Sequence, residues 1–167
     1  MPFTPFHFGP ALFFGLLLFA FIDFPTFLIA NVIVDLEPLL VVFLGLNYPL
    51  YGFFHSFAGG TIIAIILVFL MFRLSSITRK VMKFLRLEQE VLLKRVMTTS
   101  LAGVYFHILL DSPLYPDIKP LYPLEVNPFF SNDMAISIYM FCIFSLLSGI
   151  MIYIIRLAVQ AKKKSKS

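Results

Sequence analysis

Cysteine, tryptophan and charged residues are all scarce in this chain, and the scarcities exclude whole classes of site and protein. Cys142 is the only cysteine, which excludes an internal disulfide and a zinc site built from cysteine pairs. Charged residues make up 13% of the 167 residues, whereas apolar residues make up 60% and the mean hydropathy is +0.94. Soluble domains of this size are far less apolar, so the composition predicts an integral membrane protein.

Long apolar runs fill most of the sequence. They extend over residues 9–22, 26–46, 59–72, 91–110 and 135–159. A helix needs about 20 residues to cross a bilayer, so the first run is too short to cross alone and predicts a re-entrant hairpin with the second. We therefore expect an all-α membrane protein, a compact bundle of about five transmembrane or re-entrant helices, with a single integral membrane domain over residues 1–167.

Lysine and arginine are missing from most of the chain. Of the 13 basic residues, seven lie within residues 73–95, five lie at or beyond Arg156, and only Lys119 lies elsewhere. Basic residues mark cytoplasmic loops, so residues 73–95 are expected to form a cytoplasmic, basic amphipathic connector and residues 160–167 a basic cytoplasmic tail. This placement favours a location in the plasma or inner membrane and argues against nucleic acid as a partner.

The histidines are expected to gather on the opposite side of the membrane. Residues 112–133 contain five prolines, so they cannot form a helix and are expected to be an external loop. With both basic segments inside, the alternation of spans places His7, His55 and His107 near the external boundary. We therefore expect the functional site on the extracytoplasmic side.

Acidic residues interrupt the apolar runs on that same side. His107 and Asp111 are four residues apart, which puts them on one helical face, and Asp35 and Glu37 lie within the second run. An acidic residue at membrane depth costs about 2.5–3.5 kcal/mol on insertion scales, and only Lys119 is available on this side to pair with one. A divalent cation would offset that cost. Imidazole and carboxylate ligands suit zinc best, with manganese or iron as less favoured occupants.

Simpler explanations stay open for each of these residues. His7 and His55 could be hydrogen-bonding residues at the membrane interface, and Asp35 and Glu37 could end a helix ahead of Pro38. Lys119 is a candidate contact to a substrate phosphate, although a solvated loop lysine is the simpler explanation.

The order of these motifs resembles that of the membrane-bound metal-dependent hydrolases. The shared features are an early histidine, DLE before a proline, HS before an apolar helix, and HxxxD before a proline-rich segment. That family is in turn similar to zinc-dependent phospholipase C and related single-strand nucleases. The resemblance implies that one metal is held by four ligands, Asp35, His55, His107 and Asp111. It also implies that His7 and the N-terminal amine serve a second metal.

Two departures limit what the resemblance implies. The phospholipases carry a further histidine and glutamate after HxxxD, whereas no histidine follows Asp111 here. Tyr51 and Gly52 stand where the family commonly has a His-Arg pair. A trinuclear cluster is therefore not expected, and we expect one or two zinc ions.

The expected function is hydrolysis of a phosphoester in a membrane lipid or lipid-linked substrate by metal-activated water, with Glu37 or Asp35 as the proton acceptor. Two alternatives stay open. One is a transporter or channel for metal ions or protons, and the other is a non-catalytic membrane protein with a structural metal. A hydrolase would have a lipid-accessible cavity beside the ligands, whereas a structural metal would have a closed shell.

Overall fold

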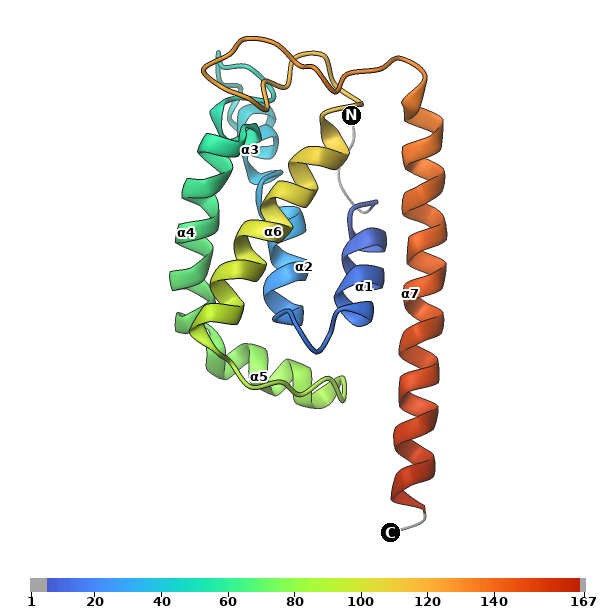
Figure 1. Cartoon of the computed structure of the whole chain (residues 1–167). Helices are drawn as coiled ribbons and strands as arrows, with labels where there is room; N and C mark the ends of the chain where they lie inside the picture. The colour runs from blue at the N-terminus through green and yellow to red at the C-terminus, as the bar shows by residue number, and fades with distance from the viewer. Residues whose placement is uncertain (1–5, 166–167) are drawn as a thin grey trace.

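The computed structural model describes residues 6–165, and within that range it contains helices and no strand (Figure 1). The helices are α1 (Phe8–Leu17), α2 (Phe24–Ile33), α3 (Leu36–Leu44), the short 3-10 helix η1 (Phe53–His55), α4 (Phe57–Arg73), α5 (Ser75–Phe84), α6 (Leu93–Asp111) and α7 (Met134–Lys164). Each predicted apolar run contributes at least one helix, and the second run is divided between α2 and α3. The predicted fold class, an all-α membrane bundle, is confirmed.

Only some of these helices are long and apolar enough to cross a membrane. Two segments qualify: Phe24–Leu44, which contains α2 and α3, and Met134–Lys163 of α7. Helices α4 and α5 would supply a third span together, but they are bent by 74° where they meet. Helix α1 has 10 residues, which agrees with the prediction that the first run is too short to cross alone.

Helix α6 lies at the centre of the packing, between α2 and α4, while α1 packs against α2 and α7 (Figure 1). Gly103 lets α6 approach α2 closely, because a Cβ atom there would collide with the Cβ of Ala30. A buried core lies between α2, α4 and α6 and includes Ala30, Leu67 and Val104. This close packing fixes the last turn of α6, which carries His107 and Asp111, against the end of α2.

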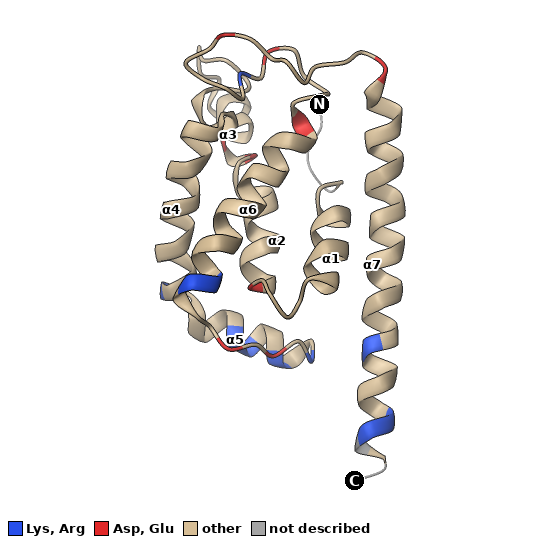
Figure 2. Cartoon of the chain, viewed as in Figure 1, with Lys and Arg blue, Asp and Glu red and all other residues tan. Residues whose placement is uncertain are grey.

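Basic residues gather at the other end of the bundle, where α5 crosses below α1 and α2 (Figure 2). Met82 faces the interior and is 7% exposed, whereas Arg79, Lys80 and Lys83 are exposed, as expected of an amphipathic helix. The helical part of the connector is shorter than residues 73–95, because Arg86 adopts a left-handed conformation with φ of 56° just after α5 ends.

The proline-rich segment 112–133 contains no α-helix, as its prolines require. It folds back over the end of the bundle that holds the histidines (Figure 1). The backbone N–H of Phe57 donates to the carbonyl of Pro120 at 2.9 Å, and Ile118 is fully buried. The segment is therefore packed against the helices.

Candidate metal centre

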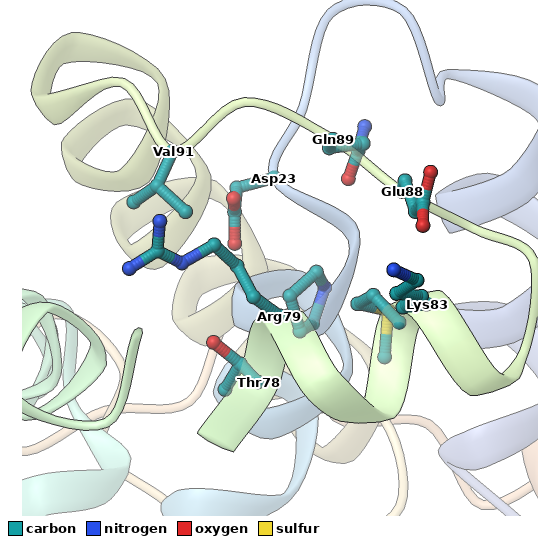
Figure 3. A pocket seen from close by; sticks show the side chains of 9 residues that line it. Asp23, Thr78, Arg79, Lys83, Glu88, Gln89 and Val91 are labelled. Carbon is teal, nitrogen blue, oxygen red and sulfur yellow. The ribbon is translucent and has the colours of Figure 1, made fainter. Parts of the chain in front are cut away.

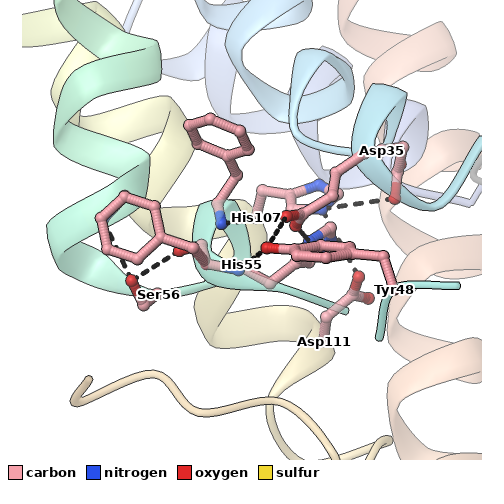
Figure 4. Close-up of polar contacts among 10 residues, drawn as sticks. Asp35, Tyr48, His55, Ser56, His107 and Asp111 are labelled. Atoms are coloured by element: carbon pink, nitrogen blue, oxygen red, sulfur yellow. Dashed lines mark hydrogen bonds and ion pairs between the residues drawn. The ribbon is translucent and has the colours of Figure 1, made fainter. Parts of the chain in front are cut away.

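Two aspartates and two histidines from three distant segments meet at one end of the bundle (Figure 4). Asp35 lies between α2 and α3, His55 ends η1, and His107 and Asp111 lie in the last turn of α6. All four residues are buried, and one ligand atom from each lies within 4.8 Å of the others. We call these four residues the ligand group.

Pro38 explains why Asp35 points into the bundle. Proline has no N–H to donate to the carbonyl of Val34, and its ring crowds that carbonyl, so a continuous helix breaks at this point. The chain instead makes two tight turns, in which the N–H of Asp35 donates to Val32 and the N–H of Glu37 donates to Val34, both at 3.1 Å. The break places Asp35 and Glu37 within the packed end of the bundle.

The hydrogen bonds of His107 leave one of its nitrogens available to a metal. Its Nδ1 lies 2.8 Å from the carbonyl oxygen of Asn31, and since a carbonyl only accepts, Nδ1 carries the proton. Nε2 is then deprotonated, and it lies 3.4 Å from Asp111 Oδ2 and 3.5 Å from Asp35 Oδ1. Ligands about 2 Å from a tetrahedral zinc ion lie roughly 3.3 Å apart, so these separations match the spacing of zinc ligands.

His55 is oriented in the same way by a carboxylate. Its Nδ1 lies 2.7 Å from Glu37 Oε2 and donates to it. Its Nε2 is buried and has no hydrogen-bond partner among residues 6–165. A buried imidazole nitrogen without a partner is costly, and a histidine held by a carboxylate on its far side is the usual arrangement of a metal ligand.

Glu37, predicted as a proton acceptor, lies behind His55 and outside the ligand group. Its Oε2 accepts from His55, and its Oε1 accepts from the backbone N–H of Phe54 at 3.2 Å and lies 3.5 Å from the hydroxyl of Tyr48. Both carboxylate oxygens are therefore engaged in holding the chain around His55. The structure gives Glu37 the position of an orienting residue.

His7, predicted as a metal ligand, also lies beside the ligand group. Its Nε2 is 3.0 Å from Asp111 Oδ1, and its Nδ1 is 2.7 Å from His107 Nδ1. The proton on His107 Nδ1 lies between the carbonyl of Asn31 and His7 Nδ1, so His7 Nδ1 carries no proton, and His7 carries its own proton on Nε2, facing Asp111. Both ring nitrogens thus face ligand residues, which suits a positioning role. The N-terminal amine, predicted to serve a second metal, lies outside the described residues.

Tyr51 is a site residue that the sequence pattern did not assign to the site. Its ring is 5% exposed, meets the ring of His55 edge-on at 4.9 Å and stacks on Tyr115 at 4.6 Å. Burial, together with the nearby charge of Asp111, raises the pKa of Tyr51 above its ordinary value, so the phenol keeps its proton. Its position where the resembled family has a polar pair was the one available signal.

Lys119, predicted as a phosphate contact, is placed differently. Its Nζ lies 3.4 Å from Glu125 Oε1 in the proline-rich segment, where the side chain of Lys119 is 44% exposed and that of Glu125 is 76% exposed. The pair lies outside the ligand group, which fits the simpler explanation of a solvated loop lysine.

The ligand group is suited to a dication. Its two carboxylates carry two negative charges, and its two imidazoles are neutral donors by the tautomers above, so the group matches the charge of a divalent metal. The side chain of Asp35 is 11% exposed, compared with 3% for Asp111 and 0% for His107. A metal ion would thus be enclosed by protein, with its most open side at Asp35. No family model, curated protein or solved structure matches this chain.

Proposed function

We propose that this chain is a membrane-embedded, metal-dependent hydrolase that binds zinc in the ligand group. The main observation that supports this proposal is that the Nε2 atoms of His55 and His107 are both buried. Each histidine has its opposite nitrogen engaged as a hydrogen-bond donor. The Nε2 of His107 lies 3.4 Å from Asp111 and 3.5 Å from Asp35, and the Nε2 of His55 is buried without a hydrogen-bond partner among residues 6–165. The resemblance to membrane-bound metal-dependent hydrolases supports the assignment of hydrolysis.

A groove beside the site supports a substrate with a hydrocarbon chain. It has a volume of about 490 Å³ and runs between α3 and α4. Its lining is apolar apart from Glu37 and Tyr48, the residues that support His55. The groove therefore reaches the residues that support His55, although none of the four ligand residues lines it. We infer that the substrate is a phosphoester in a lipid or lipid-linked molecule, which enters from the bilayer with its chain along this groove.

Each residue of the site has a distinct part in this proposal. A bound zinc ion lowers the pKa of a coordinated water to about 7 and polarises a phosphoryl oxygen. Asp35 is the ligand residue nearest to solvent, so it is positioned to accept the proton of an attacking water. Glu37 and His7 hold His55 and Asp111 in orientation, while the ring of Tyr51 packs edge-on against the ring of His55.

A structural metal is the second candidate, and one observation favours it. Four protein ligands complete a tetrahedral shell, whereas a catalytic zinc keeps one position for water. A transport function is less favoured, because the apolar core of α2, α4 and α6 lies between the ligand group and the basic end.

The decisive experiment combines metal analysis with a substrate screen on detergent-purified protein. Elemental analysis is expected to give one zinc per chain. A screen of phosphatidic acid, diacyl phospholipids and polyprenyl phosphates is expected to show hydrolysis of at least one of them. Asp35→Asn should abolish turnover, whereas the matched control Asp133→Asn, at an exposed aspartate before α7, should retain it.

Two other outcomes would overturn the proposal. Bound zinc with no turnover of any phosphoester would favour the structural metal, especially if Asp35→Asn lowered the melting temperature and changed nothing else. Protein purified without metal, and unable to take up added zinc, would remove both candidates.

A further inference from the structure

A polar pocket lies at the basic end of the bundle, where α5 crosses the beginning of α2 (Figure 3). Its volume is about 250 Å³. Its polar lining comes from Asp23, Thr78, Arg79, Lys83, Glu88 and Gln89. The pocket shares no residue with the ligand group, so a ligand bound in it is independent of the proposed hydrolase.

Two of these side chains, Gln89 and Asp23, already have hydrogen-bond partners within the protein and line the pocket without being available to a ligand. Gln89 accepts from the backbone N–H of Phe24 at 2.9 Å and donates to the carbonyls of Phe19 and Ile22. Asp23 accepts from both the backbone N–H and the hydroxyl of Thr26. These bonds fix the chain turn between α1 and α2, so the pocket is held open by the fold.

The two basic side chains of the pocket are the groups left for a ligand. Arg79 donates from Nε to the carbonyl of Ser75, which leaves its terminal nitrogens unused, and neither Arg79 nor Lys83 forms an ion pair within residues 6–165. Glu88 also lines the pocket, and like Arg79 and Lys83 it is exposed and forms no ion pair within residues 6–165. Residues 73–95 carry seven basic residues against two glutamates, so the field at this end favours an anion.

An apolar groove continues from this pocket. It has a volume of about 580 Å³ and shares Pro25, Thr78 and Met82 with the polar pocket. From there it follows one face of α2 past Leu28, Ile29, Val32 and Ile33 to Leu36. A pocket with two basic side chains free of ion pairs, within a basic segment and opening into an apolar groove, matches an amphiphile with a negatively charged head and a hydrocarbon tail.

We propose that a phospholipid binds here, with its phosphate on Arg79 and Lys83 and its acyl chains along α2. Both basic groups would donate charge-assisted hydrogen bonds to phosphate oxygens, and the chains would fill the apolar groove along α2. Gln89 and Asp23 hold the turn that forms the far wall.

The test measures bound dioleoyl phosphatidylglycerol by native mass spectrometry on protein that was first delipidated and then exchanged into lipid-detergent micelles. The double variant Arg79→Gln, Lys83→Gln should retain about tenfold less lipid than the unsubstituted protein. Lys80→Gln is the control, because it removes one positive charge from the same helix outside the pocket, and it should retain the lipid fully. Glu88→Gln should increase retention, because it removes a like charge.

Competition experiments test whether the phosphate or the acyl chains alone can account for binding. Neither inorganic phosphate nor dioleoylglycerol, which lacks a phosphate, should displace the phospholipid at equal concentration. Displacement by phosphate alone would show a free-anion site and overturn the proposal. Lipid retention unchanged in the double variant, or equally reduced in Lys80→Gln, would overturn it as well. Size-exclusion profiles matching the unsubstituted protein show that a variant is folded.

Discussion

The two ends of the helical bundle differ in whether their charged side chains are buried or exposed. At one end, two aspartates and two histidines are buried against one another, and each imidazole is oriented by a hydrogen bond. At the other end, where Lys and Arg gather (Figure 2), the side chains of Arg79, Lys80 and Lys83 on α5 are exposed. At the buried end hydrogen bonds define the tautomer of each histidine, whereas at the basic end the face of α5 places the basic side chains.

The difference follows from desolvation. An exposed lysine keeps its water and needs no fixed partner, so its placement changes little. A buried carboxylate loses its water and must recover the cost from hydrogen bonds or from a cation. Well-defined geometry is therefore expected at the buried end, and changes there should have much larger effects than changes at the basic end.

The largest effect is expected from His107→Ala. The change removes a fully buried ligand nitrogen together with the contacts to Asn31 and His7, so bound zinc should fall from one per chain to background. Elemental analysis of the purified variant measures this. Arg79→Gln, a change at the basic end, should leave the metal content unaltered. Equal zinc in His107→Ala and the unsubstituted protein would contradict the assignment of the ligand group.

Removing the metal should have the next largest effect. A chelator takes away the positive charge that offsets the two buried aspartates, and at saturating zinc the bound ion contributes about 3 kcal/mol or more to the folded state. For a chain of this length the melting temperature should fall by roughly 6–12 °C, and added zinc should restore it. His107→Ala should show no response to the chelator. A chelator-induced shift in that variant would indicate a metal bound elsewhere.

Glu37→Gln should weaken metal binding without abolishing it. The amide cannot hold His55 Nδ1–H as a carboxylate does, and loss of such an orienting group typically lowers metal affinity by about 10- to 100-fold. Competition with a fluorescent zinc chelator measures the change. Glu125→Gln is the control, because that glutamate is exposed in the proline-rich segment and pairs with Lys119. Unaltered affinity in Glu37→Gln would mean that His55 is not a ligand.

The smallest effect is expected from Lys80→Gln. The side chain is exposed on α5 and lies outside the polar pocket, so the melting temperature should change by less than about 2 °C. Thermal unfolding followed by circular dichroism gives the comparison with the buried-end variants. A large loss of stability here would show that the basic end is also held by specific contacts, and the contrast between the two ends would fail.

The helices were largely predictable, and their interruptions were less so. Apolar runs marked the positions of α4, α6 and α7, and the prolines correctly excluded an α-helix from residues 112–133. Hydropathy alone predicts one continuous arm over residues 26–46, although Pro38 divides it into α2 and α3. Within the basic connector over residues 73–95, no sequence pattern signalled the left-handed residue at Arg86, just after α5 ends.

The chemistry of the site was predictable only in part. The HxxxD spacing put His107 and Asp111 on one face, and the cost of buried acids pointed to a cation. The distinction between residues in the ligand group and residues that orient them was not visible. Glu37 and Asp35 are two residues apart, yet one holds His55 and the other faces His107, because the helix break turns them towards different neighbours.

By itself, the sequence determined that this chain is a helical membrane protein with acids and imidazoles that need a partner, because hydropathy and the cost of burying charge depend on residue type and run length. Only the tertiary structure decided which nitrogen of each histidine is available, which carboxylate serves as support, and where a pocket joins an apolar groove. Those properties depend on distances between residues up to 100 positions apart, and such distances are set by how the helices pack.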